Sequence, residues 1–324
     1  MNAGGDWRPT ATLDTLRRRA ECLAFTRDFF RARGVLEVET PALVNAPVSD
    51  VNLGSVRVDL PGLGRPLWLH TSPEYAMKRL LAAGAGDIYQ VCRVYRGAER
   101  GREHNPEFTM LEWYRLGFTL EDLMNEVALL VRGLLGAAGA SLDVEFISYV
   151  DALRRYADLD PFGELEPLRA AARDLGFDGG QAAAAGRDEL LDLIVGARVG
   201  PALGARALTF LHRYPASQAA LARLDPDDGR VALRFELYHR GLELANGYHE
   251  LASGAEQRQR FAEDLRQRSL RGLPAAALDP HLLAALDAGL PDCAGVALGF
   301  DRILMLAIGA TNIDQVLAFP VERA

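Results

Sequence analysis

Hydrophobic and polar residues repeat along the chain with two spacings, one helical and one strand-like. Apolar residues recur every three or four positions from Leu13 to Phe30 and Gly34 follows, so a first helix is predicted there. Residues 35–41 alternate apolar and charged side chains and end at Pro41, which predicts a strand. A turn-rich stretch, 45–66, leads to a short strand at 67–70.

The next segment predicts one helix and a pair of strands. Ser72 and Pro73 are typical of a helix N-cap and a first helical position, so a helix is expected to run from there to about Gly84. Residues 87–96 and 107–115 are rich in β-branched and aromatic residues and predict two antiparallel strands. The polar segment 97–106 is the loop between them.

The rest of the chain mixes both spacings. Residues 119–135 predict an amphipathic helix, and the Ala-rich residues 148–204 predict a helical insertion packed on the sheet. The remaining expected elements are strands at 231–239, 242–249 and near 294–298, a helix at 255–271 and a closing helix from Asp301. We therefore expect residues 1–324 to form one α+β domain, a mostly antiparallel sheet flanked by helices.

Composition narrows the classes of partner. The 36 basic and 44 acidic residues give a net charge of −8, which argues against non-specific binding along a nucleic acid. Lys78 is the only lysine, so 35 of the 36 basic residues are arginine, a bias typical of a genome rich in arginine codons.

Nothing in the sequence predicts a secreted or membrane protein. The three cysteines, Cys22, Cys92 and Cys293, lie far apart without metal-site spacing, which is typical of a reducing compartment. The start of the chain lacks the apolar core of a signal peptide, and no apolar run approaches the ~18 residues of a membrane span. A cytoplasmic location is therefore expected, with no membrane partner.

Three segments carry the candidate chemistry. The first ends at residues 34–41, the second comprises 94–96 and 104–114, and the third comprises 295–302 with 243–250 upstream. In this order they resemble the signature motifs of the class II aminoacyl-tRNA synthetases, most closely the catalytic domain of lysyl-tRNA synthetases. The resemblance implies the class II catalytic fold and activation of an amino acid as its adenylate by ATP.

The resemblance also implies an ATP site with two catalytic arginines. Arg96 would bridge the substrate carboxylate and the α-phosphate, and Arg302 would hold the γ-phosphate. Negative charge builds up in this transition state, and fixed cations stabilise it. Glu236 and Glu243 match carboxylates that hold Mg²⁺ in the family. The other residues matched to the ATP site are Gly97, Ala98, Glu99, His104, Asn105, Phe108 (stacked on adenine), Leu244 and Gly299.

One position departs from the family pattern. Many members carry Glu two residues after the motif arginine, where it reads the adenine amino group, but this chain has Ala98 there and Glu99 next to it. Either Glu99 takes that role or backbone atoms of the loop read the base.

Glu74, Glu112 and Glu250 match positions that contact lysine in the relatives. The ammonium group of a lysine-like substrate needs a carboxylate partner once it leaves water. The other residues matched to this pocket are Ser72, Pro73, Tyr114, Asn246, Tyr248 and Ala297. Ala297 stands where relatives that use α-lysine have glycine, so its methyl is expected to favour β-lysine; the alternative is that it only improves strand packing.

The position of the first motif bears on the acceptor. It begins near residue 34, which leaves too little sequence before it for the OB-fold that reads the anticodon in a lysyl-tRNA synthetase. The chain resembles instead the elongation factor P lysine ligase family, stand-alone relatives that join (R)-β-lysine to a lysine of elongation factor P. This resemblance implies those two substrates, no anticodon recognition, and a homodimer formed through the first motif.

Two alternatives remain. The first is another class II-like amino-acid ligase, such as an ammonia-dependent asparagine synthetase; it would need arginine or lysine in place of the pocket carboxylates. The second is a non-catalytic paralogue that binds an amino acid or a translation protein. Arg96, Arg302, Glu236 and Glu243 argue against it because they provide a complete catalytic set.

Overall fold

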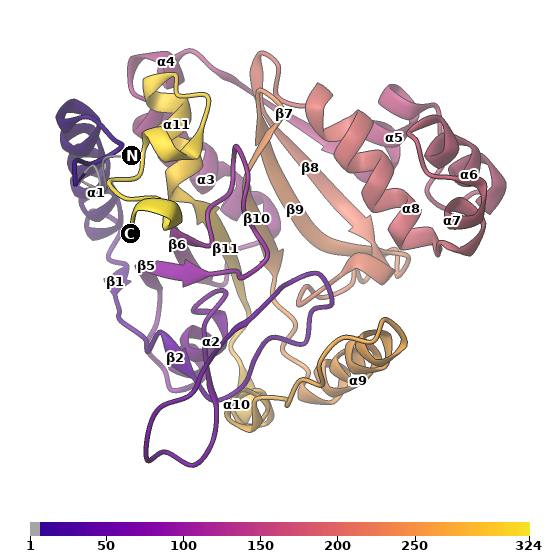
Figure 1. Cartoon of the computed structure of the whole chain (residues 1–324), viewed down its shortest axis with the longest axis horizontal. Coiled ribbons are helices and arrows are strands. Elements are labelled where there is room, and N and C mark those ends of the chain that lie inside the picture. Colours follow the sequence, from indigo (N-terminus) through magenta and orange to yellow (C-terminus); the bar gives the residue numbers. More distant parts are fainter. Residues whose placement is uncertain (1–6) are drawn as a thin grey trace, which may run out of the picture.

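A large sheet forms the centre of the computed structural model, which describes residues 7–324 (Figure 1). The strands, in sheet order, are β1 (Leu36–Glu37), β5 (Ile88–Tyr95), β6 (Glu107–Leu116), β11 (Cys293–Gly299), β10 (Leu242–His249), β9 (Val231–His239), β8 (Ala207–Pro215) and β7 (Asp143–Ser148). The outermost pairs, β1–β5 and β7–β8, are parallel and the others are antiparallel. The expected α+β fold with a mostly antiparallel sheet is confirmed.

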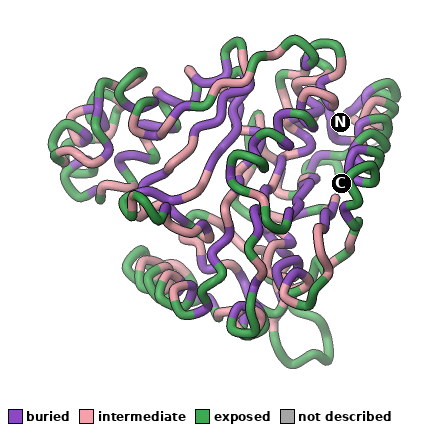
Figure 2. The backbone as a smooth tube through the Cα atoms, turned by 180° about the vertical axis from the view of Figure 1, so that it is seen from behind, coloured by how far each residue is buried: buried purple, intermediate pink, exposed green. Residues whose placement is uncertain are grey.

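Three helices cover one face of the sheet: α1 (Leu13–Arg31), α3 (Leu120–Leu135) and α11 (Phe300–Ile308). Trp113, Phe235 and Val296 pack against them from the strands, and the strands form the buried centre of the molecule in Figure 2. Side chains alternate between the faces of a strand. The residues between these apolar positions therefore point to the opposite face, where the cleft lies.

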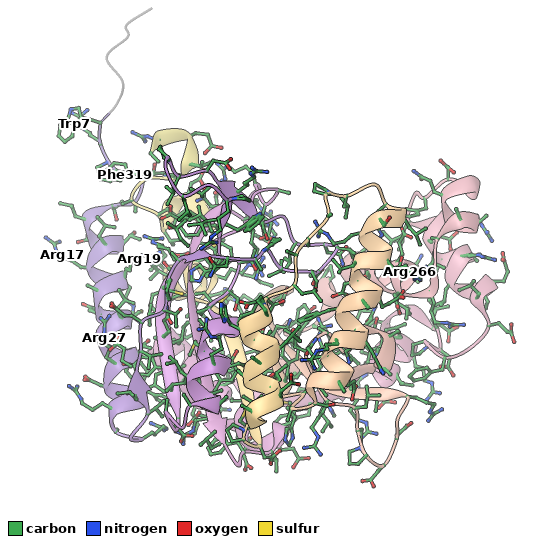
Figure 3. The ribbon with its side chains drawn as sticks, turned by 90° about the horizontal axis from the view of Figure 1, so that it is seen from below. Trp7, Arg17, Arg19, Arg27, Arg266 and Phe319 are labelled. Carbon is green, nitrogen blue, oxygen red and sulfur yellow. The ribbon has the colours of Figure 1, made fainter. Side chains whose placement is uncertain are left out.

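The first helix shows how its two faces differ. Arg19 of α1 points toward the body of the protein and pairs with Asp301, whereas Arg17 and Arg27 point away (Figure 3). The other Asp301 oxygen accepts the backbone N–H of Thr109 at 2.7 Å. Asp301 thus joins α1, β6 and α11, and it fixes the start of the helix that carries Arg302.

Residues 148–204 form α5 (Tyr149–Ala157), α6 (Leu165–Asp174), α7 (Gly179–Ala184), α8 (Arg187–Ile194), a π-turn (Val195–Val199) and a 3₁₀ turn (Gly200–Ala202). Leu211, Tyr214 and Tyr238 of the sheet pack into their apolar cluster. The flanking strands β7 and β8 were not expected from the sequence. They extend the sheet beyond β9 and give the insertion a surface to pack on.

The helix after the first motif begins one residue later than predicted. α2 covers Glu74–Ala82, with Pro73 as its N-cap. The Ser72 hydroxyl still accepts the backbone N–H of Glu74, at 3.0 Å. Its own proton goes to a carboxylate of the cleft, so Ser72 joins the helix start to the sheet.

The remaining elements pack around the sheet and its covering helices. They are α9 (Gly254–Leu270), α10 (Pro280–Gly289), the short α4 (Ala137–Ala140), a small sheet of β2 (Leu43–Val44), β4 (Leu67–Leu69) and β3 (Val56–Val58), and 3₁₀ turns at Ala216–Gln218, Ile313–Gln315 and Val321–Arg323. Within residues 7–324, no helix is both long and apolar enough to cross a bilayer.

Candidate active site

A cleft of about 1430 Å³ opens on the sheet face opposite α1 and α3. Its walls come from β6, β9, β10 and β11, from α2, α8 and α9, and from the segment before β3. The predicted site residues that line it are Ser72, Pro73, Glu74, Arg96, Glu99, His104, Asn105, Phe108, Glu112, Tyr114, Glu236, Glu243, Leu244, Asn246, Tyr248, Glu250, Ala297, Gly299 and Arg302. Residues distant in sequence therefore meet in one cavity.

The strand register explains why these residues meet. Glu112 of β6 lies opposite Ala297 of β11, which lies opposite Asn246 of β10, which lies opposite Glu236 of β9. Paired residues on neighbouring strands point to the same face. One row across the sheet thus places a residue predicted to bind the substrate ammonium, Glu112, in line with a predicted metal ligand, Glu236. Ala297 and Asn246 lie between them.

The adjacent row contains Tyr114, Gly295, Tyr248 and Arg234. A side chain cannot be added at Gly295, because its Cβ would lie 2.3 Å from the Tyr114 ring and 2.5 Å from Glu250. Gly295 and Ala297 therefore form a shallow floor on β11. The larger polar side chains of β6 and β10 stand on either side of it.

Glu112 lies at the closed end of the cleft with only 2% of its surface exposed. Its two carboxylate oxygens accept hydrogen bonds from the Ser72 hydroxyl at 2.6 Å and the Tyr114 hydroxyl at 2.7 Å. Burial, followed by repulsion from Glu74, raises the pKa of Glu112 to about 8. Within residues 7–324 no cationic side chain contacts this carboxylate, so it is available to a substrate ammonium group.

Lys78 was not among the predicted site residues, but its side chain contacts two of the predicted pocket residues. It is 2% exposed, and its Nζ lies 2.6 Å from Glu74 and 2.7 Å from Glu250. Burial raises the pKa of Glu250, and the nearby Lys78 ammonium partly opposes the rise. The four-residue spacing of Glu74 and Lys78 was the only signal in the sequence, and it is equally typical of an exposed helix pair.

The two predicted catalytic arginines lie at the other end of the cleft, and their contacts with carboxylates are long. Arg302 donates to the backbone carbonyl of Glu243 at 2.8 Å and contacts His104 Nε2 at 2.7 Å, while the Glu243 carboxylate is 3.8 Å away. Arg96 is 3.4 Å from Glu99, and its guanidinium carbon lies 5.2 Å from the Phe108 ring centre. A phosphate could replace the long carboxylate contacts of both arginines with shorter, charge-assisted ones.

The loop between β5 and β6 is tied to the end of the chain. Arg100 pairs with Asp314 at 3.1 Å and with Glu322 at 2.5 Å, and Asn105 accepts the backbone N–H of Val321 at 3.2 Å. These contacts hold the segment that carries His104 over the cleft.

Two predicted residues of this loop do not line the cleft. Gly97 and Ala98 turn toward the segment before β3, where the Gly97 N–H donates to the Gly54 carbonyl at 2.9 Å. Glu99, one residue further on, does line the cleft. The turn at 97–98 directs these two residues away from the cleft and Glu99 toward it, which the sequence alone did not show.

The predicted metal carboxylates lie on adjacent strands, β9 and β10. Glu236 accepts hydrogen bonds from Arg234 at 2.5 Å and from the Tyr238 hydroxyl at 2.6 Å. The Glu243 side chain is 42% exposed, yet it stands within the cleft, and desolvation followed by repulsion from Glu236 raises its pKa. A divalent cation between the two would relieve this repulsion, and carboxylate oxygens are the ligands that Mg²⁺ prefers.

Mg²⁺ usually retains ligands from water and substrate phosphates, so two carboxylates can be a sufficient protein contribution. Among the described residues, no group of three or more acidic, histidine or cysteine side chains could hold a metal alone. Arg234, which the sequence analysis did not select, fixes the geometry of this region: it also donates to the Asn246 side chain at 3.3 Å.

Gly299 lies at the end of β11, beside Arg302. A Cβ added there would meet the Arg302 side chain at 3.6 Å, an ordinary contact distance. The protein itself therefore does not require glycine at this position, unlike at Gly295. Any requirement must come from the ligand side of the cleft, which Gly299 lines.

Comparisons with known proteins give a consistent result. Residues 5–323 match the family model described as tRNA synthetases class II (D, K and N). The chain is 48% identical to a protein from Klebsiella pneumoniae (strain 342) and 47% identical to one from Salmonella enteritidis PT4, and each alignment covers 100% of both chains. Both relatives are named elongation factor P–(R)-β-lysine ligase.

Proposed function

The chain belongs to the class II tRNA synthetase family (D, K and N) and to its elongation factor P–(R)-β-lysine ligases, and we propose that it uses ATP to attach (R)-β-lysine to a lysine ε-amino group of elongation factor P. The observation that carries this proposal is the division of the cleft into two oppositely charged ends. Glu74, Glu112 and Glu250 suit a substrate with two ammonium groups, whereas Arg96 and Arg302 suit phosphate.

The reaction has two steps. A carboxylate oxygen of β-lysine attacks the α-phosphorus of ATP, and pyrophosphate leaves with the bonding electrons of the broken P–O bond. The acceptor amine then attacks the acyl carbon, AMP leaves, and the amine loses a proton. Arg96 stabilises charge at the α-phosphate and carboxylate, and Arg302 stabilises the leaving phosphates; fixed cations are effective here because they need no reorganisation.

We propose that Glu236 and Glu243 bind Mg²⁺. When bound, the ion neutralises charge on the phosphate oxygens. Arg234 and Tyr238 hold the Glu236 carboxylate, so one ligand is preorganised while Glu243 remains more exposed. Removal of divalent ions with EDTA should abolish pyrophosphate exchange, and added Mg²⁺ should restore it.

The adenine site is proposed to form on Phe108. Arg96 lies over one side of this ring, and His104 and Asn105 lie in the loop that borders the cleft. Because Glu99 lines the cleft and Ala98 does not, we propose that Glu99 reads the adenine amino group. Leu244 and Gly299 would complete the walls around the nucleotide.

The decisive experiment has two readouts. Exchange of labelled pyrophosphate into ATP should depend on β-lysine, and mass spectrometry should find one β-lysyl group on elongation factor P after incubation with enzyme, ATP and β-lysine. A non-catalytic paralogue would show no exchange. Exchange supported by aspartate, with none by β-lysine, would instead indicate a different amino-acid ligase.

The remaining assignments are also proposals. We propose one catalytic domain with a helical insertion at about 148–204, a cytoplasmic location, and no recognition of a tRNA anticodon. We further propose a homodimer through the first motif, where β1 is a sheet edge and Leu36 is 56% exposed. Light scattering should give twice the 35.3 kDa chain mass, and Leu36→Asp should reduce it.

A further inference from the structure

The side chain of Lys78 is buried behind the amino-acid pocket. It is 2% exposed and does not line the cleft, yet its single Nζ bonds both Glu74 and Glu250, which do. Lys78 therefore lies directly behind two of the three pocket carboxylates. Any change in its charge or shape must reach the substrate through them.

The residue type at position 78 is informative. The chain has 36 basic residues and 35 of them are arginine, including those in its other buried ion pairs, Arg115 with Glu126 and Arg234 with Glu236. An ammonium group is a compact charge, whereas a guanidinium group spreads its donors over a plane. Two carboxylates that converge on one atom at 2.6 and 2.7 Å require the compact group.

The charges of the pocket can be counted. When Glu74, Glu112 and Glu250 are all ionised, as pairing with ammonium groups favours, their charges and that of Lys78 give −3 + 1 = −2. A β-lysine molecule, the substrate of the proposed function, brings two ammonium groups, while its carboxylate faces the phosphate end. Without Lys78 the same pocket would hold −3, and one carboxyl would have to stay protonated or unpaired, at a high cost in a buried site.

We infer that Lys78 sets the charge and geometry of the amino-acid pocket for a substrate with two ammonium groups, and that it is a specificity-determining positioning residue rather than a catalytic one. The inference rests on the proposed function for the identity of the substrate. It adds to that function a reason why the pocket accepts two ammonium groups.

The groups around Lys78 and its carboxylates do not change the net charge counted for the pocket. The titratable or charged residues that face the cluster are Tyr75 and Arg79 on α2, Cys92 on β5, Tyr114 on β6, Tyr248 on β10, Cys293 on β11 and Asp264 on α9, with the Arg234–Glu236 pair beyond Tyr248. Burial raises the pKa of every tyrosine and cysteine in this set, so they remain neutral at pH 6–9. No tyrosine or cysteine around the cluster therefore changes charge over the pH range of the test.

The test compares two variants across pH with pyrophosphate exchange. Lys78→Met removes the cation but keeps most of the volume, so the pKa of the neighbouring carboxyls rises and more of them are protonated at pH 7. Each unit of pKa is a factor of ten in protonation, so KM for β-lysine should exceed the wild-type value by about tenfold or more at pH 7 and by about threefold or less at pH 9. We expect kcat to change much less than KM.

Lys78→Arg keeps the charge but cannot place two carboxylates on one atom. KM for β-lysine should again rise, but by the same factor at pH 7 and pH 9. The two variants thus separate charge from geometry. A matched control is Glu126→Gln, which disrupts a buried ion pair with Arg115 on the opposite face of the sheet and should leave KM unchanged at both pH values.

A measurement on the unmodified protein covers the case in which Lys78→Met fails to fold. Competition binding should rank β-lysine well ahead of 6-aminohexanoate, which has one ammonium group. Equal binding of the two, or a Lys78→Met effect on KM that is independent of pH, would overturn the inference. Absence of β-lysine-dependent exchange in the wild-type protein would instead refute the proposed function.

Discussion

The two ends of the cleft are built in different ways. At the amino-acid end, Glu112 and Glu250 are 2% and 4% exposed; the first lies on β6 and the second directly follows β10. At the nucleotide end, the side chains of Arg96 and Arg302 are 25% and 20% exposed and lie beside a loop and a helix start. The carboxylates of the amino-acid end are buried, and Glu112 accepts short hydrogen bonds. The arginines of the nucleotide end are more exposed, and their contacts with carboxylates are long.

This difference corresponds to what each end must do. A buried carboxylate cluster recognises a small cation by matched charge and shape, so its partners must be in place before the substrate arrives. In the proposed reaction, the arginines must instead exchange partners as phosphates bind, react and leave. Their contacts at 3.4 and 3.8 Å with Glu99 and Glu243 hold them near the required positions without competing strongly.

The largest effect should come from the nucleotide end. Arg302→Ala or Arg96→Ala removes a fixed cation from the developing negative charge, and the loss of one such group costs about 10²–10³-fold or more in kcat. Pyrophosphate exchange by purified variants measures it. Arg266→Ala is the control, because this residue lies on α9 with a 58% exposed side chain (Figure 3). Near-normal exchange by folded Arg302→Ala would refute its assignment.

The amino-acid end should give a smaller effect that is confined to one substrate. Glu112→Gln keeps the shape but removes the charge that pairs with ammonium, a loss of about 1.5–3 kcal/mol, or roughly 10- to 150-fold in KM for β-lysine. KM for ATP should stay within about twofold, because no phosphate approaches this end. Steady-state titration of each substrate checks this prediction, and an equal rise in both values would show that the two ends are not independent.

The sequence predicted these two ends unequally. The motif arginines and glutamates could be selected because residue type and order survive in a linear chain. The row of Glu112, Ala297 and Asn246 could not, since it depends on β11 lying between β6 and β10. Lys78 was missed because burial decides its role. The positions of Gly97 and Ala98 were missed because one turn directs both residues away from the cleft.

The two ends should also respond differently to pH. The pKa of Glu112 is raised to about 8, so below that pH its carboxyl is increasingly neutral and pairs poorly with ammonium. At subsaturating β-lysine, kcat/KM should therefore fall by up to about tenfold per unit below pH 8. Burial, then the nearby Arg302, lower the pKa of His104, so it remains neutral over this range and KM for ATP should stay flat.

A pH series at saturating ATP and low β-lysine measures the predicted fall in kcat/KM for β-lysine. A pH series at saturating β-lysine and low ATP measures the predicted flat profile for ATP. Glu112→Gln should flatten the β-lysine profile, because its side chain no longer titrates. A limb of unchanged steepness in that variant would assign the titration to another group, such as Glu250.

The smallest effect concerns one methyl group on the floor between the two ends. Ala297 stands between Glu112 and Asn246 and lines the cleft, so its methyl points to the space where the substrate backbone must lie. This methyl should crowd the amine on the α-carbon of α-lysine, whereas the amine of β-lysine is one carbon further along. A single methyl discriminates by only ~1–3 kcal/mol, so α-lysine should be a slow substrate rather than an excluded one.

Ala297→Gly should therefore raise kcat/KM for α-lysine relative to β-lysine by about tenfold, and by no more than about a hundredfold. The alternative is that Ala297 only improves strand packing. Ala294→Gly tests that alternative, because Ala294 is on the same strand but fully buried in the core on the opposite face. It should lower the melting temperature and leave the substrate ratio unchanged. If Ala297→Gly behaves in the same way, the selectivity for β-lysine must arise from the carboxylate end alone, where Lys78 and Glu112 fix the positions of the two ammonium groups.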